Sequence, residues 1–184
     1  MRITSEFMKA KTLPYILTSE QLLLSFSLIG FASFAIPFSL GYPQLLVGTI
    51  VNACLFLAAA FLPTSFIYPI IFFPSLAVLS RGLIFGPLTS FLVLMIPFIW
   101  LGNWLLVFGF RKIFTLVKNY GLSFFVASLI KSVFLITTSF LLIKLKLLPR
   151  QFLNSMGSIQ FITALLGGLL SLGIKNLYAR NSGT

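Results

Sequence analysis

The chain contains six apolar segments that are each long enough to cross a lipid bilayer. Their lengths of roughly 18 to 25 residues match a hydrocarbon core of about 30 Å crossed by a helix. They cover approximately residues 21–38, 44–62, 67–85, 88–110, 122–143 and 156–177. Because lipid cannot satisfy backbone polar groups, a spanning segment of this kind has to be helical. We therefore predict an all-α polytopic membrane protein with six transmembrane helices.

The polar parts of the chain are too short to fold alone. Hydrophobic residues make up 59% of the sequence and charged residues 8%, whereas about a quarter of a soluble domain is charged. We expect a cytoplasmic segment over 1–19, one membrane domain over 20–178, a C-terminal tail over 179–184, and location in the cell membrane among its lipids. Thr18 and Gln21 have the spacing of a capping box at the start of the first helix. A cleaved secretory signal is the alternative for this first segment.

The formal charge is +11, from 13 Lys and Arg residues against two acids. Such a balance indicates nucleic acid in a soluble protein, but here the cations lie between apolar segments, so we predict no nucleic-acid partner. Cytoplasmic loops accumulate cations, which favours both termini inside. The inside then holds Arg2, Lys9, Lys11, Arg111, Lys112, Lys118, Lys175 and Arg180, and the outside holds Arg81, Lys144, Lys146 and Arg150. The three cations of the fifth connection oppose this orientation.

Several chemistries lack the residues they need. The chain has no His and one cysteine, Cys54, and both acids precede the first apolar segment. A metal site, an iron–sulfur cluster and general acid–base catalysis would need more ligands or titratable groups than these. No Walker A sequence is present for nucleotide phosphates. We expect neither an enzyme nor a cofactor.

Lys131 lies in the middle of the fifth apolar segment. About 20 Å of helix separates it from Lys118 and from Lys144, at 1.5 Å per residue. A cation at the bilayer centre costs at least ~2.5 kcal/mol, so it normally faces the protein interior and finds a partner. Neither Glu6 nor Glu20 is placed to be that partner.

Three solutions for Lys131 stay open. The amine is neutral, or it is held by carbonyls and hydroxyls such as those of Ser128 and Ser132, or it meets an anion from elsewhere. The third solution is a binding site. Its rival is a structural lysine, solvated in a cavity or at a shifted helix end.

Polar and small residues also recur at helical spacing in two other segments. Gln44, Gly48 and Asn52 share one face of the second segment. A second stripe lies on the sixth segment and comprises Gln160, Thr163, Ala164, Gly167 and Ser171. Small residues let helices approach closely, so a packing seam is favoured here over a ligand surface.

The third and fourth segments add further candidates. Pro69 and Pro74 predict a broken or kinked third helix, and a sharp turn is expected at Gly82, Gly86 and Pro87. Arg81 would then stand at a cavity mouth, or alternatively be an interfacial charge that ends a short helix. On the fourth segment, Asn103 is a buried polar candidate, and Trp100 is deep enough to line a pocket.

The stretch "PSLAVLSRGLIFGP", from Pro74 to Pro87, the turn "GLIFGPLTSF" and the later "LGN" resemble the substrate-binding S components of energy-coupling factor transporters. The resemblance covers Pro74 to Asn103 in detail and the rest in helix count. It implies capture of a small vitamin-like or micronutrient solute, with a coupling membrane subunit and cytoplasmic ATPases as partners. It also implies a small-residue docking surface on the first helix, at Gly30, Ala32, Ser33 and Ala35, although the family's paired-alanine spacing is absent.

Two other stretches, "GTIVNACLFLAA" (48–59) and "SMGSIQFITALLGG" (155–168), resemble a family of small prokaryotic membrane proteins. Some members of that family carry an iron-hydrogenase label. Hydrogenase iron chemistry needs several cysteine ligands, which Cys54 alone cannot supply.

The predicted function is solute binding for uptake. The candidate polar lining comprises Lys131, Asn52, Gln44, Asn103, Arg81 and Trp100. Its excess of cations over acids favours an anionic or carbonyl-rich ligand. The main alternative is a structural or assembly subunit whose polar residues satisfy one another between helices. An ion channel requires a continuous polar pore, and the lack of interior acids and histidines disfavours this function.

Overall fold

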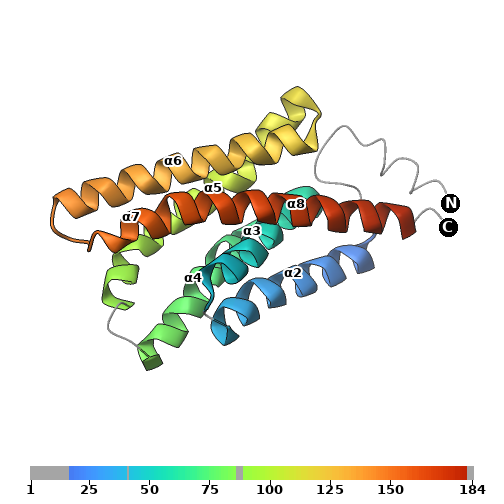
Figure 1. The fold of residues 1–184 in the computed structure, drawn as a ribbon. Coiled ribbons are helices and arrows are strands. Elements are labelled where there is room, and N and C mark those ends of the chain that lie inside the picture. The colour runs from blue at the N-terminus through green and yellow to red at the C-terminus, as the bar shows by residue number, and fades with distance from the viewer. Residues whose placement is uncertain (1–16, 41, 86–88, 182–184) are drawn as a thin grey trace.

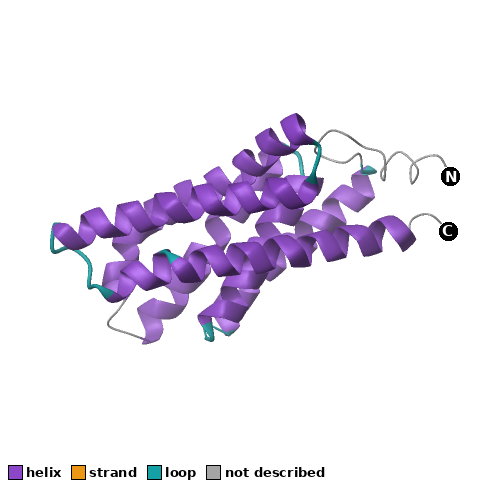
Figure 2. Cartoon of the chain, turned by 45° about the horizontal axis from the view of Figure 1, so that its top comes forward, coloured by secondary structure: helices purple, strands orange, loops and turns teal. Residues whose placement is uncertain are grey.

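The computed structural model describes residues 17–40, 42–85 and 89–181, and within these ranges it contains helices and no strands (Figure 2). The helices are α2 (Ser19–Ser39), α3 (Gln44–Phe61), α4 (Thr64–Phe85), α5 (Thr89–Val117), α6 (Tyr120–Lys144), the short α7 (Gln151–Met156) and α8 (Ser158–Asn181). Six of them are long and apolar enough to cross a membrane. The all-α, six-helix prediction is confirmed, and each predicted segment overlaps one long helix, although α5 continues to Val117, beyond the predicted end near residue 110.

The long helices run alternately up and down through one bundle (Figure 1). α3 lies at its centre, where it packs against α2, α4, α5 and α8, and it is the most buried of the six. α6 packs against α5 and α8, while α2 lies at the edge against α3 and α4. The start of α2 and the end of α8 lie at the same end of the bundle, which we call the terminal end. The opposite end, where α2 joins α3 and α7 joins α8, we call the distal end.

Aromatic rings fill the core toward the terminal end. Phe56 of α3 meets Phe110 of α5 edge to face, with ring centroids 5.4 Å apart, and Phe110 meets Tyr120 of α6 at 4.9 Å. Phe124 extends the cluster from α6, with its centroid 6.1 Å from that of Phe56. Edge-to-face pairs of this kind add to the stabilisation that the buried area gives. The core toward the terminal end is therefore built largely from packed aromatic rings.

The third membrane helix was predicted to be broken or kinked. α4 continues as a helix through both Pro69 and Pro74. No break at either proline is shown, and a kink in this helix stays a prediction. The turn expected at Gly86 and Pro87 lies outside the described residues.

The edge helix α2 begins as its sequence predicts. The Thr18 hydroxyl accepts a hydrogen bond from the Gln21 amide, and the Gln21 side chain accepts one from the Thr18 amide, which completes the capping box. Farther along, Gly30 and Ser33 are buried, and a Cβ at Gly30 would lie 3.5 Å from Ile70 of α4. Gly30 lets α2 approach α4 closely, and since both residues are buried, no small-residue surface faces outward at their positions.

Ala32 and Ala35, the other two residues of that predicted docking surface, are half-buried. The exposed face of α2 consists mainly of large apolar side chains, among them Leu23, Leu24, Leu28 and Phe31. Such a face suits contact with lipid tails.

Candidate functional site

Lys131 lies in the interior of the bundle. Its residue is 2% exposed, and its ammonium Nζ donates to the amide oxygen of Asn52 at 2.7 Å and to that of Asn103 at 2.9 Å. These acceptors come from α3 and α5, so the side chain of α6 ties three helices together. Lys131 therefore does not face lipid, the position that would have supported a purely structural lysine.

The two amides are held with their oxygens toward the lysine. The Asn103 nitrogen donates to the Ile71 carbonyl of α4 at 3.2 Å. The Asn52 nitrogen donates to the Gly48 carbonyl at 2.9 Å and to the Thr163 hydroxyl of α8 at 3.2 Å. A backbone carbonyl only accepts, so each amide must present its NH₂ group to it, and its oxygen then faces Lys131. The network therefore spans α3, α4, α5, α6 and α8.

The serine hydroxyls that were expected to hold Lys131 do not bond to it. Ser128 donates to the Phe124 carbonyl of its own helix at 2.7 Å. Ser132 is buried, and its hydroxyl has no hydrogen-bond partner among the described residues. Asparagine amides on neighbouring helices take the role that local serines were predicted to have.

No carboxylate among the described residues neutralises Lys131. The acid within the described ranges is Glu20, which is exposed in the first turn of α2 at the terminal end. An ammonium has three N–H donors, and the described residues supply acceptors for two. In an ammonium, one N–H donor is thus left for a further partner.

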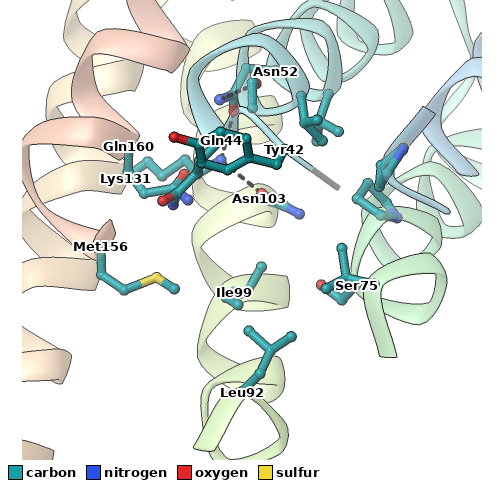
Figure 3. Close-up of a pocket in the computed structure, with 16 residues that line it drawn as sticks. Tyr42, Gln44, Asn52, Ser75, Leu92, Ile99, Asn103, Lys131, Met156 and Gln160 are labelled. Atoms are coloured by element: carbon teal, nitrogen blue, oxygen red, sulfur yellow. Dashed lines mark hydrogen bonds between the residues drawn. The ribbon is translucent and has the colours of Figure 1, made fainter. Parts of the chain in front are cut away.

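A cavity of about 370 Å³ adjoins this lysine (Figure 3). Lys131, Asn52 and Asn103 line it in mid-bundle, and it extends toward the distal end, where Tyr42 and Met156 line it. Its volume lies in the range of small-molecule sites, which are about 300–1,000 Å³ and mostly apolar with a few placed polar groups.

The structure brings four of the six predicted site residues together. Lys131, Asn52, Asn103 and Gln44 all line the cavity, and Gln44 also donates to the Ser155 carbonyl at 3.4 Å. Arg81 and Trp100 do not line it.

Those two residues have other surroundings. Arg81 is half-buried and reaches the Phe38 carbonyl at the end of α2, at 3.5 Å. Trp100 packs edge to face on Phe72, with ring centroids 4.8 Å apart.

Three polar cavity residues were missed as ligand candidates. Gln160 was assigned to the packing seam, and Ser75 and Tyr42 were not singled out as ligands. Ser75 carried a detectable signal, because it is a polar residue directly after Pro74 in an apolar segment. The seam itself is present: a Cβ at Gly48 would lie 2.9 Å from the Thr163 side chain.

A second, wider depression of about 800 Å³ lies at the α6–α7 connection. Its charged lining consists of Lys144, Lys146 and Arg150, which are all exposed. It contains none of the predicted site residues and is separate from the Lys131 cavity.

Comparisons with known proteins identify no relative: no protein family, curated protein or solved structure matches the chain. Membership among the S components therefore stays a prediction. Function has to be inferred from the geometry around Lys131.

Proposed function

We propose that this multi-pass membrane protein binds a small anionic or carbonyl-rich solute in the cavity beside Lys131. The observation that carries the proposal is an interior lysine, 2% exposed, that borders a cavity and has no carboxylate partner among the described residues. An ionisable group inside a membrane bundle is expensive and usually marks a functional site. An incoming anion would supply the missing counter-charge.

The cavity favours this function over that of a purely structural subunit. In a structural subunit, the polar side chains between helices would be expected to satisfy one another and to leave the interior filled. Here two amides satisfy part of the ammonium, and space remains beside it. Preformed amide oxygens would hold the lysine in place while its third N–H group receives the solute.

Uptake is the wider process that this binding would serve. The predicted orientation puts the distal end, toward which the cavity extends, on the outer side of the cell membrane. Since the sequence has no motif for nucleotide phosphates, energy would come from partners. A coupling membrane subunit with cytoplasmic ATPases, as the S-component resemblance implies, is the proposed arrangement.

The test is purification from the native membrane, followed by mass spectrometry of solutes released on denaturation. We expect a stoichiometric small molecule from the wild type and from Lys112→Met, which removes an exposed cation elsewhere. Lys131→Met is close in shape to the wild type and should lose the solute while keeping its gel-filtration profile. Gln160→Leu, which changes another lining residue, provides a second variant if Lys131→Met folds poorly, and it should retain less solute.

Equal retention by wild type, Lys131→Met and Gln160→Leu would overturn the proposal. A stoichiometric partner protein without any released solute would instead favour the structural or assembly subunit.

A further inference from the structure

The charge of the cavity lining limits the charge of the ligand. Lys131 is the one ionisable cation or anion among the lining residues that the structure describes. One ammonium balances one negative charge. A second negative charge on the ligand would be taken out of water without a cation to pair with it, which is strongly unfavourable in an apolar interior. The cavity therefore selects against dianions such as phosphate monoesters.

The other side chains that line the cavity indicate that most of the ligand is apolar. Most of the lining side chains are apolar, and six of them are Val51, Pro74, Val78, Leu92, Ile99 and Met156. They come from α3, α4, α5 and α7, and in Figure 3 Leu92 and Ile99 lie below Lys131. A solute that is polar over its whole length would lose its hydration against these walls without gaining hydrogen bonds.

Ser75 marks a second polar point. It is 6% exposed, it lines the cavity from α4, and its hydroxyl has no hydrogen-bond partner among the described residues. In Figure 3 it lies on the other side of the cavity from Lys131. Buried hydroxyl groups are nearly always hydrogen bonded, so an orphan at a cavity wall calls for a partner from within the cavity. A ligand hydroxyl or carbonyl would supply one.

The depth of the lining residues gives the ligand a direction. Lys131 lies halfway along α6, whereas Leu92 lies near the distal start of α5 and Tyr42 lies in the distal α2–α3 connection. A solute that enters from the distal end therefore passes Tyr42 and Leu92 first and reaches the ammonium last. Its charged group would travel inward ahead of its apolar body.

From these four observations we infer that the ligand is an amphipathic monoanion, such as a carboxylate on a compact apolar body. Its charged group binds Lys131, and a second, polar substituent binds the Ser75 hydroxyl. The inference rests on the proposed function and narrows the solute class that this function leaves open.

The test uses four ring compounds on protein freed of retained solute and placed in phosphatidylcholine nanodiscs. Phenylacetate is the monoanion, phenylacetamide the neutral analogue and phenylmalonate the dianion, while 4-hydroxyphenylacetate adds a polar group at the far end. Binding is measured by calorimetry and by the shift in unfolding temperature. We expect the neutral and dianionic compounds to bind at least about ten-fold more weakly than phenylacetate.

Two substitutions on α4 test the second polar point. Ser75→Ala should weaken binding of 4-hydroxyphenylacetate and leave phenylacetate unchanged. Ser80→Ala is the matched control, because Ser80 is exposed and its hydroxyl is bonded to the Leu76 carbonyl of its own helix. Equal losses in both variants, or no loss in Ser75→Ala, would overturn the assignment of Ser75.

Compound binding and solute retention together distinguish a wrong ligand class from a wrong binding function. If the amide or the dianion binds as well as phenylacetate does, or if no compound binds although a Lys131-dependent solute is retained, the monoanion class is wrong and the binding function stands. If no compound binds and Lys131→Met changes no solute retention, the binding function itself fails.

Discussion

Gly167 of α8 lies against the backbone of Ala53 in α3, so closely that a Cβ at position 167 would come within 2.7 Å of the Ala53 amide nitrogen. The same Cβ would lie 2.8 Å from the Thr49 carbonyl oxygen. Backbone atoms cannot rotate away as a side chain can. This contact sets the separation of α3 and α8, and with it the distance between Asn52 and Thr163.

Gly167→Ala should therefore destabilise the protein by about 1–3 kcal/mol, the usual cost of overpacking. Gly173→Ala is the matched control on the same helix, since a Cβ there would meet nothing within 4 Å. The control should keep or raise the unfolding temperature, because alanine favours helix over glycine by about 1 kcal/mol. Equal unfolding temperatures for the two variants, measured by calorimetry in nanodiscs, would show that α3 and α8 are not in backbone contact.

Arg111 caps the end of α3. Its Nε donates to the Ala59 carbonyl at 2.8 Å, and its terminal nitrogens donate to the Leu62 carbonyl and to the Thr64 hydroxyl. In a continuing helix the Ala59 carbonyl would accept from residue 63, but Pro63 has no N–H to give. The guanidinium replaces that donor and also places a cation at a helix C-terminus, where the dipole favours it.

Arg111→Met should lower stability by at least about 1.5–3 kcal/mol, which is the net value of one hydrogen bond to a charged group. Arg111→Lys should recover part of the loss, since an ammonium can reach fewer of these acceptors than the guanidinium fork. Lys112→Met, at the exposed neighbouring position, serves as control and should have little effect. A wild-type unfolding temperature in Arg111→Met would contradict the capping role.

Asn103 and Lys131 should be energetically coupled. Asn103→Leu removes an acceptor from a buried ammonium, whereas in the Lys131→Met background there is no ammonium left to satisfy. We expect the double variant to be more stable than the sum of the single losses predicts, with a coupling of about 0.5–3 kcal/mol. The four proteins of this cycle, compared by denaturation after removal of retained solute, test it. Simple additivity would mean that the hydrogen bond contributes nothing to stability.

The number of membrane helices and their approximate ends follow from the sequence, because lipid permits few alternatives to a helix of spanning length. The interior position of Lys131 follows for a related reason, since a cation without a partner is costly in hydrocarbon. Asn52 and Asn103 are polar residues in apolar segments, and the same cost brings them to the lysine, while Gln44 lines the cavity and bonds the Ser155 carbonyl.

The positions of Arg81 and Trp100 outside the cavity could not be predicted from the sequence. The spans are apolar on nearly every face, so the hydrophobic pattern gives the depth of a residue in the membrane but does not orient it around its helix axis. Trp100 is one turn from Asn103 in depth and yet packs on Phe72 outside the cavity. Ser75 is a polar residue in an apolar segment, but the side of α4 that its hydroxyl faces depends on the packing of α4 against its neighbours, which the sequence does not give.

Trp100→Phe should leave solute retention unchanged. The indole N–H is buried without an acceptor among the described residues, so its removal relieves a cost of about 1–3 kcal/mol that offsets the smaller packing area of phenylalanine. The ring contact with Phe72 is kept, and the unfolding temperature should stay near that of the wild type. Loss of the retained solute from a well-folded Trp100→Phe variant would return Trp100 to the ligand site.

The proposed uptake requires the distal end of the bundle to face outward, and thiol labelling tests this requirement. Cys54 is 5% exposed in the middle of the core, so the wild type should not react with a membrane-impermeant maleimide. Arg150→Cys places an exposed thiol at the distal end, and Arg180→Cys places one at the terminal end of α8. In intact cells we expect Arg150→Cys to be labelled and Arg180→Cys to be labelled only after the membrane is permeabilised. Arg150→Cys leaves eight cations inside against three outside, and Arg180→Cys leaves seven against four, so the cytoplasmic excess of Lys and Arg persists in both variants. The reverse labelling pattern would put the cavity mouth in the cytoplasm, and capture of an external solute through the distal end would then be impossible.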